Sequence, residues 1–428
     1  MCKIFNLILL FTFSLLITQC SSNRPFLPIR KNPANENNNK VINRELTKAE
    51  KSLVESDNSF GFKLFKKIVK EEKDKNIFIS PLSVSMALAM TYNGSNGSTQ
   101  EAMQKTLELS NLTLKEINES YKSLIKLLTS LDPKVVFQIA NSIWVREGFP
   151  VEKEFINLNK TYFNAEVANL NFSTPEAPNI INSWVDKNTN GKIKEIITPP
   201  IDPLTMLFLI NAIYFKGTWT YEFNKENTRD DSFTLPDRSK KSCKMMSQKG
   251  VFQYFENADF QAIDLPYGDG DFSMTIFLPN PKKNIDSLIT ELDQENWNKW
   301  IKSFSKREVV IIMPKFKLEY ELVLNEVLEA LGMEIAFSPS GADFTKMYEK
   351  EKVGENLYIS KVKHKTFVDV NEEGTEAAAA TIVEMTLEGR QERQETIMRV
   401  DRPFIFVIRE NKSQTIFFLG KIVEPILE

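Results

Sequence analysis

The order of apolar patterns along the chain is the feature that most limits its fold. Helical spacing of apolar residues predicts helices at 59–70, 81–90, 99–109 and 114–130. Alternating or continuous apolar runs then predict strands at 135–145, 204–215, 252–265, 272–278, 309–316, 357–370 and 404–409. Helices followed by long strands favour an α+β fold over a doubly wound parallel sheet.

The composition predicts one large domain without a strong overall charge. The chain has 428 residues, of which 42% are hydrophobic and 26% charged, so it can bury a large core. A net charge of -3 gives no field that would attract nucleic acid or an anionic membrane. Because no repeat or further linker interrupts residues 51–428, we expect them to form a single domain that acts as a monomer.

Thiol and imidazole groups are too scarce for most catalytic and metal sites. The chain contains only Cys2, Cys20, Cys243 and His364. A metal site built from such ligands needs several of them, so no metal is expected. A catalytic triad would have to use His364, and the sequence shows no GxSxG motif and no phosphate-binding glycine loop. The sequence therefore disfavours an enzyme, and we expect no cofactor.

The N-terminus has the pattern of a targeting segment. A short basic start and an apolar core at 4–17 precede Ile17-Thr18-Gln19-Cys20. This pattern resembles a bacterial lipoprotein signal, which implies removal of residues 1–19, lipidation of Cys20 and a place at the cell surface or in the periplasm. Gln19 departs from the small residue usual there, so an ordinary secretory signal is the alternative. Residues 20–50 are rich in asparagine and are expected to form a disordered tether.

Residues 371–395, NEEGTEAAAATIVEMTLEGRQERQE, fit two secondary structures. Their glutamates and alanines have high helix propensity. At a period of two, however, Thr375, Ala377, Ala379 and Thr381 share one uncharged face, as they would in a half-buried strand. These residues alone leave the choice open.

Six ordered motifs carry a resemblance to a known family. They are NIFISPLSVSMALAM at 76–90, NTNGKI at 188–193, FLINAIYFKGTW at 208–219, ALGMEIAFSPSGADF at 330–344, LYISKVKHKTFVDVNEEGTEAAAAT at 357–381 and MRVDRPFIFVI at 398–408. Together they resemble the serpins, the serine protease inhibitors, over essentially the whole domain. The resemblance implies the serpin fold, with about nine helices packed on three β-sheets and an exposed C-terminal reactive loop.

For the ambiguous segment, the resemblance implies the hinge of a suicide-substrate inhibitor. A serine protease would cleave the loop, 374–386 would enter the central sheet, and the protease would be trapped covalently. The hinge comprises Glu372, Glu373, Gly374, Thr375, Glu376, Ala377, Ala378, Ala379, Ala380 and Thr381. Slim side chains suit a strand that enters a packed interior, and a glycine supplies backbone freedom where the chain must swing. The alternative is a non-inhibitory surface lipoprotein with this fold, an adhesin or a ligand binder.

The family's usual hinge length places the scissile bond. Counted from Glu372, it gives Glu388-Gly389, which would suit an acid-preferring protease such as a glutamyl endopeptidase. A hinge one residue shorter gives Leu387 and chymotrypsin-like or elastase-like targets. Arg390 would suit trypsin-like enzymes but needs a longer hinge.

The resemblance also assigns residues that control opening of the central sheet. Ser80, Ser83, Asn211 and His364 match the family's polar shutter, and Trp219 matches the end of the sheet at which insertion begins. The alternative for His364 is an ordinary buried histidine with its hydrogen bonds satisfied.

Overall fold

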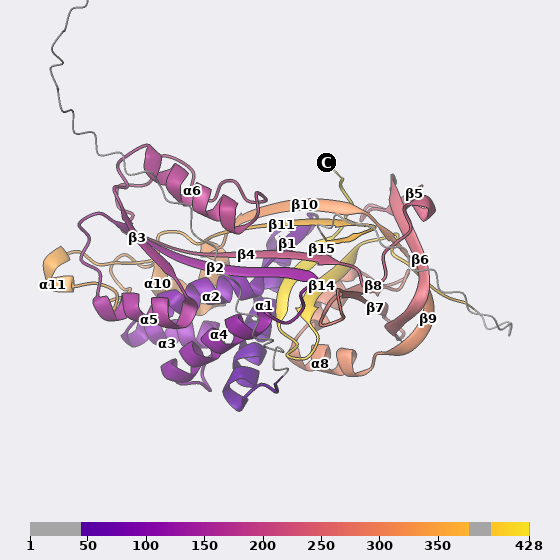
Figure 1. Cartoon of the computed structure of the whole chain (residues 1–428), viewed down its shortest axis with the longest axis horizontal. Helices are drawn as coiled ribbons and strands as arrows, with labels where there is room; N and C mark the ends of the chain where they lie inside the picture. The colour runs from indigo at the N-terminus through magenta and orange to yellow at the C-terminus, as the bar shows by residue number, and fades with distance from the viewer. Residues whose placement is uncertain (1–43, 376–394, 428) are drawn as a thin grey trace, which may run out of the picture. The chain divides into compact units, whose positions relative to one another are not determined.

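A long six-stranded sheet forms the central layer of the computed structural model, which describes residues 44–375 and 395–427 (Figure 1). Its strand order is β10-β11-β12-β4-β2-β3. The strands are β2 (Val135–Arg146), β3 (Glu166–Leu170), β4 (Leu207–Thr218), β10 (Phe316–Val323), β11 (Lys363–Asn371) and β12 (Gly374–Thr375). The two-residue strand β12 lies between the much longer β11 and β4, so these two long strands are held together at one end only.

Helices cover both faces of this sheet, with α6 on one side and α1 to α5 on the other (Figure 1). The longer helices are α1 (Lys48–Glu71), α2 (Pro81–Tyr92), α3 (Gly97–Thr106), α4 (Leu114–Leu128), α5 (Lys153–Phe163), α6 (Glu176–Asn188), α7 (Ile285–Glu291) and α8 (Gln294–Lys302). Four-residue helices are α9 (Asn325–Leu328), α10 (Glu334–Phe337) and α11 (Lys350–Val353). Because α2 is apolar nearly all round, it is buried beneath the central sheet.

The second sheet has nine strands and packs beside the helices. Its order is β1-β15-β14-β8-β7-β6-β9-β13, with β5 paired to β6. The strands are β1 (Ile77–Ile79), β5 (Arg229–Thr234), β6 (Lys240–Glu256), β7 (Phe260–Tyr267), β8 (Phe272–Pro279), β9 (Ser305–Pro314), β13 (Thr396–Arg399), β14 (Phe404–Glu410) and β15 (Ile416–Ile422). Three sheets were expected. The described strands form two networks because the 17-residue β6 pairs with β5, β7 and β9.

The α+β prediction is confirmed, and so are most of the predicted elements. The prediction of one strand at 252–265 is wrong, because β6 ends at Glu256 and the chain reverses before β7 begins at Phe260. The Asn257 side chain makes this turn by accepting bonds from the N–H groups of Asp259 and Phe260. The strand expected at 309–316 is also divided, because β9 ends at Pro314 and β10 begins at Phe316. Helices α5, α6, α7 and α8 were not predicted.

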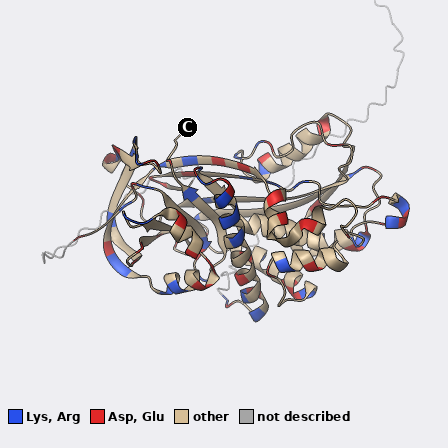
Figure 2. Cartoon of the chain, turned by 180° about the vertical axis from the view of Figure 1, so that it is seen from behind, with Lys and Arg blue, Asp and Glu red and all other residues tan. Residues whose placement is uncertain are grey.

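Two hydrophobic clusters hold these layers together. The larger one joins the two sheets and the helices below them. A smaller cluster lies between α6 and the central sheet and contains Trp144, Phe172, Ile181 and Ile210. Along the ribbon in Figure 2, positions of Lys and Arg alternate with positions of Asp and Glu over both the helices and the strands. This mixture of the two signs agrees with the composition, which has 54 basic and 57 acidic residues.

Candidate functional site

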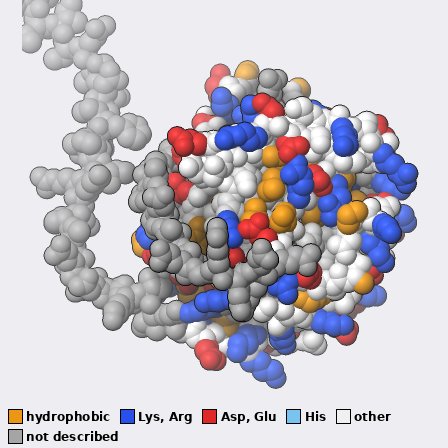
Figure 3. Space-filling view, turned by 90° about the vertical axis from the view of Figure 1, so that its right-hand side faces the viewer, with side chains coloured by type: hydrophobic (Ala, Val, Ile, Leu, Met, Phe, Trp, Pro, Cys, Tyr) orange, Lys and Arg blue, Asp and Glu red, His pale blue; other side chains and the backbone are white. Residues whose placement is uncertain are grey.

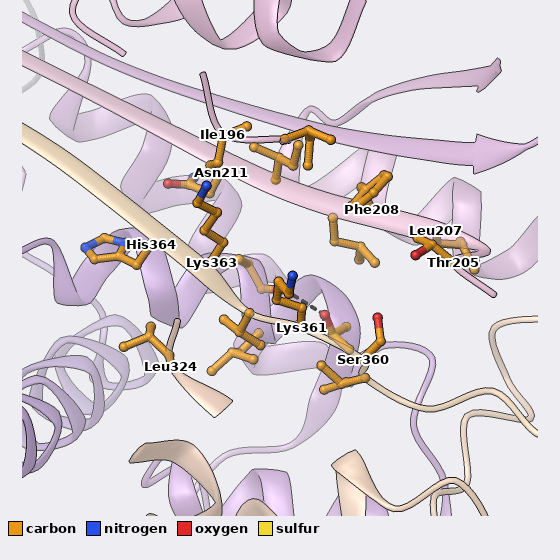
Figure 4. A pocket seen from close by; sticks show the side chains of 18 of the residues that line it. Ile196, Thr205, Leu207, Phe208, Asn211, Leu324, Ser360, Lys361, Lys363 and His364 are labelled. Atoms are coloured by element: carbon orange, nitrogen blue, oxygen red, sulfur yellow. Dashed lines mark hydrogen bonds between the residues drawn. The ribbon is translucent and has the colours of Figure 1, made fainter. Parts of the chain in front are cut away.

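The central sheet contains a gap between β11 and β4. β11 pairs with β10 over Lys363–Val370, and β4 pairs with β2 over Leu207–Gly217. Among the described residues, Gly374 and Thr375 alone join β11 to β4 through β12. A cavity of about 460 Å³ lies farther along the gap, and side chains of both strands line it (Figure 4). Strand edges that no described strand pairs with are templates for a further strand.

Two of the residues predicted to form the hinge, Gly374 and Thr375, lie in this gap. Thr375 is buried and pairs with Val370 on β11 and with Gly217 on β4. Gly374 has φ of 151°, and a Cβ atom there would lie 2.1 Å from the carbonyl oxygen of Gly217. The close contact with β4 therefore requires glycine at position 374.

Glu372 anchors the chain just before the gap. Its buried carboxylate accepts bonds from Lys315 Nζ at 2.7 Å and from Thr228 Oγ1 at 2.7 Å. Burial alone would raise the pKa of Glu372, but the bonds from Lys315 and Thr228 outweigh it and lower the pKa. The neighbouring Glu373 pairs with Lys225. Glu372 therefore stays ionised at pH 7, and its bonds fix the chain just before β12.

Trp219 lies at this same end of the gap, beside β12. Its backbone N–H donates to the carbonyl oxygen of Glu373 at 2.9 Å, and its indole Nε1–H donates to that of Asn371 at 2.9 Å. Its ring stacks on Tyr267 with the centroids 4.4 Å apart. Trp219 thus holds the segment that leads into β12 by two separate bonds.

The predicted shutter residues all line the cavity, and the structure joins them in two groups. His364 Nε2 accepts the backbone N–H of Ser80 at 3.0 Å, and Ser80 Oγ accepts the N–H of Ser83 as the cap of α2. Burial lowers the pKa of His364 to about 4, so the ring is neutral at pH 7. Asn211 lies across the gap on β4 and donates instead to Asn141 Oδ1 at 2.8 Å.

Several contacts of the predicted site residues could not be expected from the sequence. Residues predicted for the hinge or the shutter contact Lys315, Thr228, Tyr267 and Asn141, each of which is distant in sequence from its partner. The predicted residues Glu376, Ala377, Ala378, Ala379, Ala380, Thr381, Leu387, Glu388, Gly389, Arg390 and Cys20 lie outside the described residues. Their roles stay predictions.

The described residues offer little for metal or thiol chemistry. Within 44–375 and 395–427, no group of three His, Cys, Asp or Glu side chains is arranged to hold a metal ion. Cys243 is a free, buried thiol, and burial raises its pKa to about 11. It is therefore protonated at pH 7 and a poor nucleophile.

Comparisons with known proteins identify the family. The family model described as serpin (serine protease inhibitor) matches residues 55–425. Human neuroserpin is 36% identical over 363 residues, covering 82% of this chain and 87% of its own. The leukocyte elastase inhibitor of Xenopus laevis is 36% identical over 377 residues, covering 86% and 97%. The chain belongs to the serpin family.

Solved structures agree with this assignment. The thermophilic serpin tengpin in its native state has a TM-score of 0.81 at 32% identity, with 89% of this chain and 95% of tengpin covered. Human thyroxine-binding globulin has a TM-score of 0.80 at 28% identity, with 89% and 100% covered. The family therefore includes proteins named for protease inhibition and a protein named for binding a small molecule.

Proposed function

We propose that this protein is a suicide-substrate inhibitor of serine proteases. A protease cleaves the loop after Glu388, residues 374–386 enter the gap between β11 and β4, and the protease is carried along as a covalent acyl-enzyme. The observation that carries the proposal is the gap itself, which has β12 at one end and, beyond it, two strand edges with which no strand of the described residues pairs. A strand that fills the gap would satisfy both edges.

The pairing of β12 sets the register of such a strand. Thr375 pairs with Val370 and Gly217, and antiparallel partners run in opposite directions, so each step forward in the loop is one step back in both neighbours. Continued in this way, the register pairs Ala377 with Val368 and Phe215, Ala379 with Thr366 and Ile213, and Thr381 with His364 and Asn211. The facing β11 residues His364, Thr366 and Val368 are buried, so small side chains are what this face can accept.

The same register limits the length of the inserted strand. β4 begins at Leu207, and the partner of Leu207 would be Met385. Leu387 and Glu388 would then lie just beyond the paired region, near the far end of the sheet. This supports insertion of 374–386 and a scissile bond at Glu388-Gly389, with Leu387 and Arg390 as alternatives.

A protease that engages the loop would meet the end of the molecule formed by β6 and β9. The described residues that flank the loop lie there: Thr375 enters the gap, and Glu395 pairs with Lys249 of β6 at 2.8 Å. Figure 3 faces this end and shows hydrophobic side chains grouped among charged ones. Val251 of β6 and Ile397 of β13, which pairs with β9, are about half exposed. This end of the molecule therefore offers both apolar and charged side chains for contact with the protease.

The test is incubation with a panel of serine proteases that includes a glutamyl endopeptidase, an elastase, a chymotrypsin and a trypsin. Denaturing electrophoresis should show a protease-sized covalent adduct, and the released C-terminal peptide should begin at Gly389. Cleavage into two fragments with no adduct, and no rise in melting temperature after cleavage, would contradict inhibition. That outcome would favour a binding or adhesive role, as the likeness to thyroxine-binding globulin allows.

For localisation, we propose export and anchoring through a lipid on Cys20, with residues 20–50 as the tether. The described helices include none that is long and apolar enough to cross a membrane. Cys20→Ser should abolish incorporation of labelled fatty acid and release the protein from the membrane fraction. If the variant and the natural chain are both found free outside the cell, the segment is an ordinary secretory signal.

A further inference from the structure

Tyr267 lies beneath the hinge and contacts the last described hinge residue. Its hydroxyl oxygen is 2.6 Å from Thr375 Oγ1, and both residues are buried. Burial raises the pKa of Tyr267, and the contact with Thr375 opposes this shift without reversing it, so the hydroxyl stays protonated. Tyr267 ends β7 of the nine-stranded sheet and stacks on Trp219. The bond therefore ties the hinge to a fixed residue of the other sheet.

Two glycines make room for this contact. A Cβ atom on Gly217 would lie 2.9 Å from the Tyr267 ring. A Cβ atom on Gly374 would lie 2.1 Å from the backbone of Gly217, as noted above. The tyrosine ring therefore occupies the space where β4 has no side chain, and its hydroxyl reaches past β4 to Thr375. Side chains on either glycine would push the hinge and the tyrosine apart.

We propose that Tyr267 is a positioning residue that holds Thr375 in the register of the inserted strand before any protease binds. This inference rests on the proposed function, since it concerns how insertion begins. Thr375 already has the partners, Val370 and Gly217, that it keeps when the strand grows. Insertion can then extend a ladder that already exists. The entropic cost of bringing the start of the strand between β11 and β4 has already been met when the protein folds.

The bond matters because two processes compete after cleavage. Insertion traps the protease, while hydrolysis of the acyl bond releases it and leaves a cleaved, inactive inhibitor. If the hinge withdraws from the gap, the pairs of β12 must form again before insertion can proceed. Insertion is then slower, and a larger fraction of the acyl-enzyme is hydrolysed. Tyr267→Phe removes one buried hydrogen bond, which should shift the equilibrium toward the withdrawn hinge about fivefold, equivalent to about 1 kcal/mol. The fraction of withdrawn molecules rises by at most this factor.

The experiment compares the full chain with Tyr267→Phe, Thr375→Val and the double variant. Tyr320→Phe is the matched control. Tyr320 lies on β10, and its hydroxyl donates to Glu72 Oε2 at 2.7 Å instead of contacting Thr375. Hydrogen exchange of the peptide spanning 371–375 is measured in the intact protein. The ratio of covalent adduct to cleaved inhibitor is then measured with a protease that cuts the loop.

We expect hinge exchange about fivefold faster in Tyr267→Phe and Thr375→Val, with a larger share of cleaved inhibitor. The double variant should be no worse than either single variant because all three lack the same bond. Tyr320→Phe should match the natural chain in both measurements. Unchanged exchange and an unchanged ratio in Tyr267→Phe would overturn the inference. If the natural chain forms no adduct with any protease, the proposed function fails, and the exchange measurement still decides whether Tyr267 holds the hinge.

Discussion

The ion pair between Lys315 and Glu372 should make a measurable contribution to the stability of the intact protein. The Nζ and Oε2 atoms are 2.7 Å apart, and the Glu372 side chain is only 6% exposed while that of Lys315 is 26% exposed. Removing one partner from a fully buried pair costs about 3–5 kcal/mol, and a surface pair contributes at most about 1 kcal/mol. Because Lys315 keeps some contact with water, Lys315→Met should cost about 2–3 kcal/mol.

Urea unfolding of the uncleaved protein at pH 7 measures this cost. Glu372→Gln and the double variant complete a cycle, and the double variant should be more stable than the sum of the single costs predicts, because it leaves no unpaired charge. Lys249→Met is the control, since Lys249 pairs with Glu308 and Glu395 at the surface. It should cost at most about 1 kcal/mol. If Lys315→Met unfolds like the natural chain, or if the single costs simply add, the pair does not anchor the hinge.

Three further perturbations test other parts of the structure. Gly374→Ala should displace β12 from the gap, because the added Cβ atom would clash with the carbonyl oxygen of Gly217. Hydrogen exchange at 374–375 should then be faster than in the natural chain, and equal exchange would contradict the clash. Ala379→Glu should convert the inhibitor into a substrate, cleaved at nearly the natural rate with little adduct, and an unchanged adduct yield would contradict the register. Burial raises the pKa of Asp57 to about 7, against an ordinary value of 3.8, while Tyr121 and Ser85 act in the opposite direction. The protonated carboxyl contributes fully to stability below the unfolded pKa of 3.8, and this contribution is lost progressively as the pH rises to 7. The stability of the natural chain relative to Asp57→Asn should therefore fall by about 3 kcal/mol between pH 4 and 7 in urea unfolding, and a constant difference would contradict this prediction.

The sequence predicted the elements whose local patterns are strong. The apolar helix α2 and the strands β2 and β4 lie within a few residues of their predicted bounds. The break between β6 and β7 was missed because Asn257, Ala258 and Asp259 include neither glycine nor proline, and the turn depends on an asparagine side chain. Helix α6 was missed because Pro175 and Pro178 stand at its start, where proline is tolerated although it usually indicates an interruption.

The candidate site was predictable only in part, for a different physical reason. The resemblance identified Glu372 and Trp219, but not the residues that hold Glu372, because Lys315 and Thr228 come from other strands and turns. Long-range ion pairs leave no pattern in the local sequence. Tyr267 likewise appeared only as an apolar residue of a strand. Its contact with Thr375 depends on Gly217, which faces its ring, and on Gly374, which lies against the backbone of Gly217.

The hinge itself provides a reason why the gap stays open. At one end β12 stands between β11 and β4, which places these strands about two strand spacings, or about 10 Å, apart. Direct pairing of β11 with β4 would require expelling β12 and breaking the bonds of Thr375 and Trp219. The contacts of β12 therefore keep β11 and β4 from pairing directly. The cavity and the strand edges that no described strand pairs with follow from the position of β12, and under the proposed function a longer strand in the same register would fill the gap.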